Sequence, residues 1–297
     1  MSIHEFATHR SPLLDFDPTP RAFIEPDVQV RPRDVPEACV VTFFGDTVQR
    51  LLDDGGRVLA RNRWADGEHP LIEIVHEGQR LAVLYSGVGA PLAAGLLEET
   101  IAMGCRAFVV CGGAGALHED LTVGHLVVVR SALRDEGTSH HYRPADRWID
   151  LDAGATRVLE QTLAEDGVPF VTGRTWTTDA PYRETPAKIA ARRSEGCVTV
   201  EMEAAALAAV AQFRDVPLAQ VLYGGDDLTG EVDAGNDRVV ADHAAARDDG
   251  EGVLVVDARV QDADGDAVVG QHRLVDGLGG EVDRAVVLAR DPGGERG

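Results

Sequence analysis

Ala107-Phe-Val-Val-Cys-Gly-Gly-Ala-Gly-Ala116 is a continuous apolar run that passes directly into glycines. An uninterrupted apolar run is typical of a parallel strand that is buried on both faces. Glycines at the end of such a strand let the backbone come close to a ligand. The stretch therefore predicts a central strand of an α/β sheet with a binding site at its carboxyl end.

The patterns on either side of this stretch alternate between strand and helix. Apolar runs predict strands at Val40–Phe44, Leu71–Val75, Leu81–Tyr85, Leu126–Val129, Val168–Val171, Val198–Val200 and Leu218–Tyr223. Periodicity and capping signals predict helices at Ala90–Met103, Asp152–Asp166, Ala187–Arg193 and Glu203–Phe213. Leu71–Val75 and Leu81–Tyr85 are expected to pair as a hairpin. The alternation indicates an α/β domain with a mixed, mainly parallel sheet.

The ends of the chain differ from its centre. Residues 1–38 are rich in proline and show little periodicity, which predicts an extended arm. Residues 39–235 hold the main domain. Residues 236–297 form an atypical acidic segment with no Phe, Trp or Tyr, although Val253–Val256 and Ala285–Leu288 could be strands. For this segment we expect a poorly ordered tail, with a small separate domain as the alternative.

Composition excludes several classes of function. The chain has 297 residues, and 28 Lys and Arg against 50 Asp and Glu give it a formal net charge of −22. Nucleic acids and anionic membranes are polyanions, so neither is expected as the main partner. No apolar run approaches the ~18 residues of a membrane-spanning helix. Met1–Arg10 lacks the apolar core of a signal peptide, so a cytoplasmic location is expected. The four cysteines lack metal-ligand spacing and are expected to be buried, reduced thiols.

Four strand ends carry unusual residues, and ligands of open α/β sheets bind at this edge. The first is Ser86-Gly-Val-Gly-Ala-Pro91, where a strand runs into glycines and then a helix. The second is Gly112-Gly-Ala-Gly-Ala116. Gly87, Gly89, Gly112 and Gly113 are candidates for close contact with a substrate, and the two loops could line one cavity from neighbouring strands. The spacing of a dinucleotide fingerprint is absent from both.

The other two strand ends carry carboxylates. Val200-Glu-Met-Glu-Ala204 places two glutamates around a methionine where a strand enters a helix. One glutamate could grip a vicinal diol while Met202 packs on the apolar face of a sugar. Gly225-Asp226 follows a buried strand, where desolvation can keep a carboxyl protonated and able to donate to a leaving group.

These four motifs, in this order and with Val123-Gly-His-Leu-Val127 after the second, resemble the nucleoside phosphorylase family. The family comprises hexameric-type purine nucleoside phosphorylases, uridine phosphorylases and related nucleoside hydrolases, and the resemblance covers about Cys39 to Gly230. It implies a three-layer α/β/α subunit, and a homo-oligomer that is a dimer or a hexamer built as a trimer of dimers. It also implies cleavage of an N-glycosidic bond by phosphate, giving a free base and ribose 1-phosphate, with no metal and no organic cofactor.

The resemblance also implies residue roles. Glu203 would hold the ribose hydroxyls, Met202 would pack on the sugar and Glu201 would help shape the base pocket. Asp226 would protonate a purine ring nitrogen as the base leaves. Tyr182 and Arg183 fall where the family places its base-contacting loop, and His141 lies in a segment that resembles the one before the base site of uridine phosphorylases. For phosphate, the candidates are Gly45, Arg50 and Arg63.

The sequence departs from the family pattern at three places. The phosphorylases usually carry an arginine two residues before the second glycine loop, where this chain has Val110, and Arg50 stands one place later than expected. These two changes leave hydrolysis by water and non-catalytic nucleoside binding as alternatives to phosphorolysis. The residues after Arg238 lack the long apolar helix with which the family usually closes, and a shifted reading frame would explain their composition.

Overall fold

The structure is a computed structural model of the chain. It describes residues 9–76, 78–118, 120–121, 125–228, 257–259 and 288–290. The first half contains η1 (Pro12–Leu14), α1 (Pro26–Gln29), β1 (Ala38–Thr42), α2 (Gly45–Asp53), β2 (Arg57–Trp64), β3 (Gly67–His76), β4 (Gln79–Tyr85), α3 (Ala90–Met103) and β5 (Ala107–Ala116). The second half contains β6 (Leu126–Asp135), α4 (Ser139–Tyr142), β7 (Trp148–Asp150), α5 (Ala153–Glu165), β8 (Phe170–Thr178), η2 (Pro181–Arg183), α6 (Pro186–Ser194), β9 (Cys197–Glu201), α7 (Ala204–Arg214), β10 (Leu218–Asp227), β11 (Asp257–Arg259) and β12 (Leu288–Arg290).

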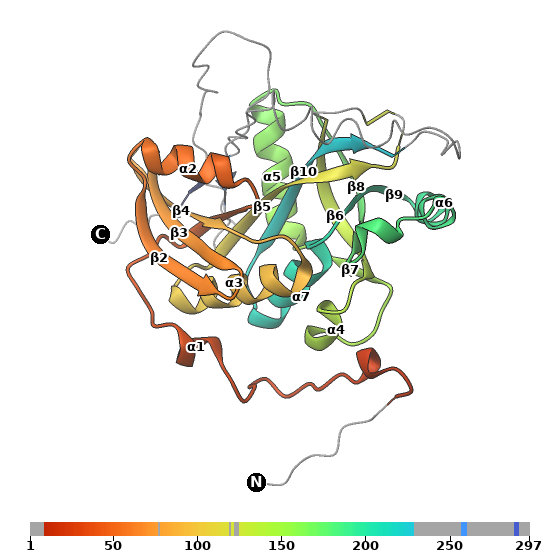
Figure 1. The fold of residues 1–297 in the computed structure, drawn as a ribbon. Coiled ribbons are helices and arrows are strands. Elements are labelled where there is room, and N and C mark those ends of the chain that lie inside the picture. The colour runs from red at the N-terminus through yellow and green to blue at the C-terminus, as the bar shows by residue number, and fades with distance from the viewer. Residues whose placement is uncertain are drawn as a thin grey trace.

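One large mixed sheet forms the centre of the molecule (Figure 1). Strands β4, β1, β5 and β10 are parallel neighbours, as are β6, β8 and β9. Antiparallel pairs join these groups, because β10 pairs with β6 and β9 pairs with β5. The strands β5, β10, β6, β8 and β9 therefore close into a ring, while β4, β3 and β2 extend from it through β1.

Two apolar cores lie on opposite faces of the sheet. On β1 the side chains of Cys39 and Val41 enter the core under α3 and α7, whereas Ala38 and Val40 enter the core under α2 and α5. The same alternation appears on β4 and β5, because successive residues of a strand point to opposite faces. Helices cover both faces, so the α/β fold with helix layers around a mixed sheet is confirmed (Figure 1).

The predicted elements are confirmed with differences at their ends. Helix α3 has the bounds that the sequence predicts, with Pro91 in its first turn and Gly104 at its C-cap. Strand β8 is longer than the four residues predicted, since it continues through a polar stretch to Thr178. The sequence reading missed α2 and β2, whose polar residues mask the apolar pattern. Helix α2 covers part of one face of the sheet, and β2 forms one edge of it.

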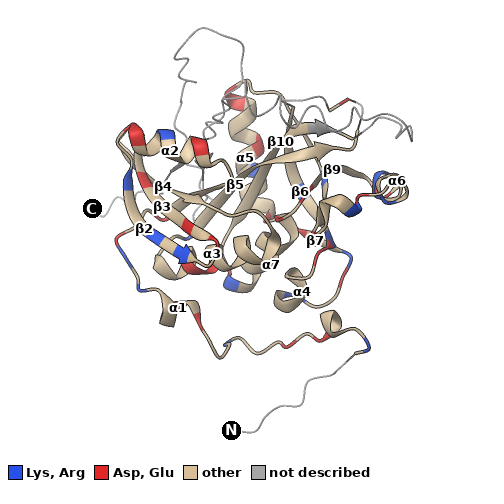
Figure 2. Ribbon diagram, in the orientation of Figure 1, with Lys and Arg blue, Asp and Glu red and all other residues tan. Residues whose placement is uncertain are grey.

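Charge is distributed unevenly over the elements. Acidic residues mark the outer helices α2 and α5, whereas α7 is uncharged up to Arg214 (Figure 2). All eight residues from Ala204 to Ala211 are buried in α7. A helix that is apolar all round is stable only inside the protein, so α7 lies within the core.

Some sequence expectations lie outside the described residues. These include most of the segment 236–297 and the strand predicted at Val253–Val256. The four cysteines are free and buried, as expected. No helix in the described part of the chain is long and apolar enough to cross a membrane.

Candidate active site

The carboxyl end of β5 is the centre of the site. Gly115 of β5 lies opposite Asp226 of β10 on one side and opposite Val200 of β9 on the other. Strand β9 ends one residue later at Glu201, and α7 begins three residues further on at Ala204. Three of the four motifs found in the sequence therefore meet on three neighbouring strands.

Glu203 joins the remaining motif to these three. Its Oε1 accepts a hydrogen bond of 2.5 Å from the backbone N–H of Gly89. Gly89 is the N-cap of α3 and has φ 103°, a left-handed conformation that favours glycine. Glu203 is itself the N-cap residue of α7. The carboxylate thus lies between two helix N-termini, where negative charge is stabilised.

Glu201 is fixed by donors from β8 and from the start of α7. Its Oε1 accepts from the Thr177 hydroxyl at 2.6 Å, and its Oε2 accepts from the backbone N–H groups of Glu203 at 2.7 Å and Ala204 at 2.6 Å. The Thr177 hydroxyl also accepts from the N–H of Ala205 at 3.0 Å. The family resemblance implies that Glu201 helps shape the base pocket, whereas these contacts show a carboxylate that caps the start of α7. Its contact with a base stays a prediction.

The two carboxylates have perturbed pKa values. Burial raises the pKa of Glu201, against the effect of its Thr177 and backbone hydrogen bonds. Burial also raises the pKa of Glu203, and the nearby charge of Glu201 raises it further. Glu201 has three donors and Glu203 two, the backbone groups of Gly89 and Met202, so the negative charge is better held on Glu201. A proton shared by this pair therefore resides preferentially on Glu203 in the absence of substrate.

Close packing explains the glycines of the two loops. A Cβ on Gly87 would lie 2.1 Å from the Leu92 side chain and 2.9 Å from His69. A Cβ on Gly113 would lie 3.3 Å from the Tyr223 ring, and one on Gly112 would lie 3.3 Å from Phe43. The glycines admit these rings close to the backbone at the end of the sheet.

The expectation that the two loops come from neighbouring strands is wrong, because β1 lies between β4 and β5. The segment after β1, Phe43–Gly45, therefore lies between them. Phe43 packs on Gly112, and the Phe44 ring lies 5.6 Å from the Tyr223 ring. This segment leads directly into α2, so the N-terminus of α2 adjoins the site.

The predicted phosphate ligands are divided by the fold. Gly45 is the first residue of α2 and is exposed. Arg50 lies on the same helix, and its guanidinium donates to the Thr47 hydroxyl in the first turn at 3.2 Å. Arg63 lies on β2, two strands away from β4, and forms an ion pair of 2.7 Å with Glu68. The fold thus brings Gly45 and Arg50 together and holds Arg63 on the edge hairpin.

Three predicted substrate contacts are exposed side chains in this chain. Tyr182 and Arg183 are exposed in η2, and Tyr182 is 97% exposed. His141 is exposed on α4, whose Tyr142 packs edge-on against Phe213 at 5.6 Å. Phe213 lies in the last turn of α7, about 15 Å along the helix from Glu203 at a rise of about 1.5 Å per residue. The contact of His141 with a substrate stays a prediction.

The other predicted residues, Met202 and Asp226, lie in the segments next to Gly115 of β5, and their roles stay predictions. Met202 is half-buried between Glu201 and Glu203. The backbone of Asp226 lies in β10 beyond a bulge at Gly224, and its side chain lies outside the described part of the chain. Among the described residues, no three His, Cys, Asp or Glu side chains gather as a metal site.

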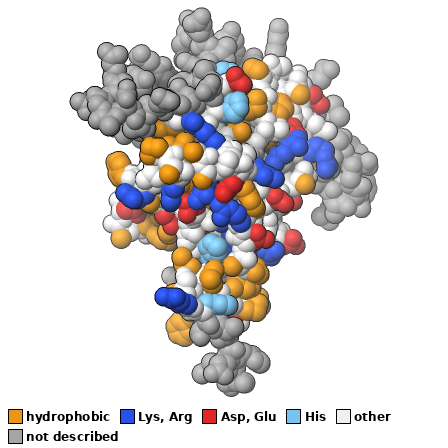
Figure 3. All heavy atoms as spheres, turned by 90° about the vertical axis from the view of Figure 1, so that its right-hand side faces the viewer, with side chains coloured by type: hydrophobic (Ala, Val, Ile, Leu, Met, Phe, Trp, Pro, Cys, Tyr) orange, Lys and Arg blue, Asp and Glu red, His pale blue; other side chains and the backbone are white. Residues whose placement is uncertain are grey.

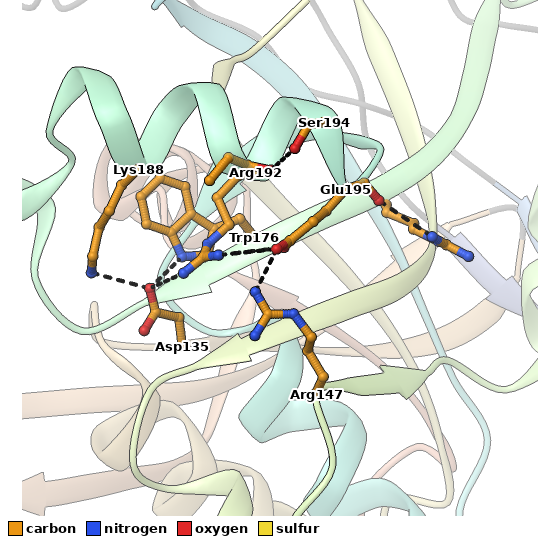
Figure 4. Close-up of polar contacts among 9 residues, drawn as sticks. Asp135, Arg147, Trp176, Lys188, Arg192, Ser194 and Glu195 are labelled. Atoms are coloured by element: carbon orange, nitrogen blue, oxygen red, sulfur yellow. Dashed lines mark hydrogen bonds and ion pairs between the residues drawn. The ribbon is translucent and has the colours of Figure 1, made fainter.

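A charged cluster fixes the elements around the exposed η2 loop. Asp135 at the end of β6 accepts from Trp176 Nε1 at 3.0 Å, Lys188 Nζ at 3.2 Å and Arg192 at 3.2 Å (Figure 4). Glu195 binds Arg192 and Arg147 beside it (Figure 4). Figure 3 turns this side of the molecule toward the viewer and shows basic and acidic side chains gathered across its middle. The cluster holds α6 against the sheet.

Several residues at the site were not singled out from the sequence. Phe44, Tyr85 and Tyr223 end the strands predicted at Val40–Phe44, Leu81–Tyr85 and Leu218–Tyr223, but they were not named as candidates. Thr177 is the polar residue of a buried strand end, and its partner Glu201 lies 24 positions away. Aromatic residues at strand ends were the available signal, whereas only the fold reveals the partner of Thr177.

Comparisons with known proteins identify relatives of this arrangement. Residues 37–255 match the family model described as the phosphorylase superfamily. A guanosine phosphorylase from Halorubrum lacusprofundi is 27% identical over 216 residues, which cover 72% of this chain and 86% of that protein.

Two solved structures share the fold. A uridine phosphorylase from Vibrio fischeri has a TM-score of 0.60 and 24% identity, over 67% of this chain and 82% of that one. A purine nucleoside phosphorylase from Toxoplasma gondii, solved in complex with immucillin-H, has a TM-score of 0.60 and 20% identity, over 67% and 83%. At these identities, the two structures support the fold.

Proposed function

The chain belongs to the phosphorylase superfamily, and from that premise we propose that it cleaves the N-glycosidic bond of a purine nucleoside with inorganic phosphate. The products are the free base and ribose 1-phosphate, and phosphate is the only co-substrate. The enzyme type is that of a pentosyltransferase, in agreement with its phosphorylase relatives.

The hydrogen bond between Glu203 and Gly89 carries this proposal. It links the helix start after β4 to the helix start after β9, and it occupies Oε1. A backbone hydrogen bond from Met202 also favours the charged form of this carboxylate. Two carboxylate oxygens offer about four acceptor positions, so acceptor capacity remains for a ligand. In this proposal the vicinal diol of ribose donates its two hydroxyls to the remaining acceptor positions of Glu203. A carboxylate that binds hydroxyls also stabilises the positive charge of an oxocarbenium-like transition state.

The reaction forms one bond to C1′ of the ribose, from phosphate, and breaks another, to the base. A phosphate oxygen forms the bond to C1′ while the bond between C1′ and the base nitrogen breaks. The electron pair of the broken bond moves into the base, which must gain a proton. Asp226 supplies that proton to a ring nitrogen of a purine in this proposal, which is why a purine is favoured over uracil.

Hydrolysis is the second candidate, and one observation favours it. Val110 is fully buried in the apolar core under α3 and α7, so this position offers no cation to phosphate. A site with fewer cations binds a dianion less tightly, and water could then replace phosphate as the nucleophile.

An assay of base release tests the proposal. The full chain is incubated with guanosine, inosine, adenosine and uridine, each with and without inorganic phosphate. We expect base release from purine nucleosides only with phosphate, in a 1:1 ratio to ribose 1-phosphate. Glu203→Gln is the matched variant of reduced activity. Release without phosphate would instead identify a hydrolase, and saturable binding without release would identify a nucleoside-binding protein.

A further inference from the structure

Tyr85 lies at the carboxyl end of β4, between the glycine loop that follows this strand and the segment that follows β1. It is the last residue of β4 and pairs in register with Thr42, the last residue of β1. A Cβ built on Gly45 would lie 3.4 Å from the Tyr85 hydroxyl and 3.5 Å from the carbon that bears it. The phenol oxygen therefore lies directly beside the first residue of α2.

The first turn of α2 presents hydrogen-bond donors at the same point. Helix starts leave their first backbone N–H groups without partners in the helix. Arg50 adds a guanidinium that reaches back to Thr47 in this turn. No described residue hydrogen-bonds to the Tyr85 hydroxyl, so its O–H can be donated to a ligand here.

A buried histidine fixes the Tyr85 ring from the side of β3. The His69 ring stacks on Tyr85 with centroids 5.7 Å apart and planes inclined by 22°. The His69 side chain is 6% exposed, and its Nε2 lies 3.0 Å from Asp66. Because His69 also packs against Gly87, the orientation of Tyr85 is coupled to the glycine loop before α3.

We propose that the Tyr85 hydroxyl donates a hydrogen bond to the attacking phosphate at the N-terminus of α2, with His69 as the residue that positions the ring. This assignment rests on the proposed phosphorolysis and names the donor that the buried, apolar Val110 does not supply. A phenol is neutral and pre-oriented, so it adds a donor without adding a charge that must be desolvated.

Titration of inorganic phosphate into the full chain tests the assignment without any turnover. Tyr85→Phe removes one oxygen and keeps the ring that stacks on His69. We expect the Kd for phosphate to rise about tenfold, as for the loss of one hydrogen bond to a charged group. Tyr142→Phe is the matched control, because it removes a hydroxyl at the opposite end of α7, and its Kd should equal that of the wild type.

Steady-state kinetics give the second readout. In Tyr85→Phe the KM for phosphate should rise about tenfold while the KM for the nucleoside stays within about twofold. His69→Gln should shift the KM for phosphate in the same direction and by less.

An unchanged phosphate Kd in Tyr85→Phe overturns the assignment, as does a wild type that binds no phosphate. Base release without phosphate refutes the proposed function separately, because the titration contains no nucleoside.

Discussion

At the scale of single residues, the two glutamates at the start of α7 perform different tasks although one residue separates them. Both carboxylate oxygens of Glu201 accept hydrogen bonds, one from the Thr177 hydroxyl and one from the first backbone N–H groups of the helix. Glu203 accepts only from the backbone of Gly89 and Met202 among the described residues, so in the proposed function it keeps acceptor positions for a ligand. Burial of a carboxylate costs stability unless it is fully paired, so the cost at Glu203 is tied to its function.

Replacement of Glu203 by glutamine separates stability from activity. Burial raises the pKa of Glu203 to about 8 from an ordinary value of 4.5. A raised pKa in the folded state favours folding below pH 4.5, and this advantage is lost as the pH rises toward 8. Glu203→Gln should therefore be more stable than the wild type at pH 8.5, by on the order of 2 kcal/mol, and should gain less at pH 5.

Urea denaturation at both pH values measures this difference, with Glu37→Gln, an exposed carboxylate outside the site, as the control. The same variant should lose roughly 10- to 100-fold in kcat/KM, the cost of one hydrogen bond to a charged group. A stability difference that is equal at both pH values would contradict the raised pKa.

Asp226 offers the second prediction at this scale. Asp226→Asn cannot donate a carboxyl proton to the departing base, so kcat for purine nucleosides should fall by about 100-fold. The melting temperature should stay close to that of the wild type. Asp227→Asn, the neighbouring carboxylate, is the control. Unchanged turnover in Asp226→Asn would remove this residue from the mechanism.

At the scale of elements, the start of α7 is held by a strand that is distant in sequence. The Thr177 hydroxyl of β8 accepts from Ala205 and donates to Glu201, so one side chain ties β8 to both β9 and α7. The periodicity of the sequence predicts β9 and α7 correctly, since Val198–Val200 and the alanine-rich run are local signals. It gives no sign of the link between them and Thr177, because that link depends on strand order.

Thr177→Val measures this link. The variant keeps the shape of the side chain and removes the hydroxyl, which leaves the N–H of Ala205 and one oxygen of Glu201 without their partner. The free energy of unfolding should fall by about 2 kcal/mol. Thr172→Val on the exposed part of the same strand is the control and should change it by less than about 0.5 kcal/mol. Equal stability of the two variants in urea would show that the hydroxyl is dispensable.

At the scale of the whole molecule, buried ion pairs join the arm to the core. Arg214 at the end of α7 binds both oxygens of Glu98 on α3, at 2.6 and 3.0 Å, and lies 3.5 Å from Glu25 of the arm. The backbone N–H of Arg33 also donates to the carbonyl of Met103 at the end of α3. The arm thus lies against α3 and α7, on the side opposite to the core under α2 and α5 (Figure 1).

Arg214→Met measures how much these ion pairs contribute to the free energy of unfolding. It leaves two buried carboxylates without a cation, so the free energy of unfolding should fall by about 3 kcal/mol. Glu98→Gln in the same chain should restore part of the loss, since it removes one of the two unpaired charges. Arg157→Met on the exposed face of α5 is the control. A double variant no more stable than Arg214→Met would show that the loss comes from packing and not from charge.

The sequence by itself determined the α/β class, the order of most elements and four strand ends rich in glycine or carboxylate. It did so because apolar periodicity, caps and glycine turns are encoded within a few residues of one another. The polar helix α2 and strand β2 were not predicted, because their burial depends on residues that are distant in the sequence.

Only the tertiary structure decided how these pieces meet. It closed five strands into a ring, placed β1 between the two glycine loops and brought Thr177 to Glu201 and Tyr85 to Gly45. It also separated Arg50, on the helix beside the site, from Arg63, which pairs with Glu68 on the edge hairpin. The physical reason is that strand order and ring closure depend on contacts between residues far apart in the chain, which no local pattern records.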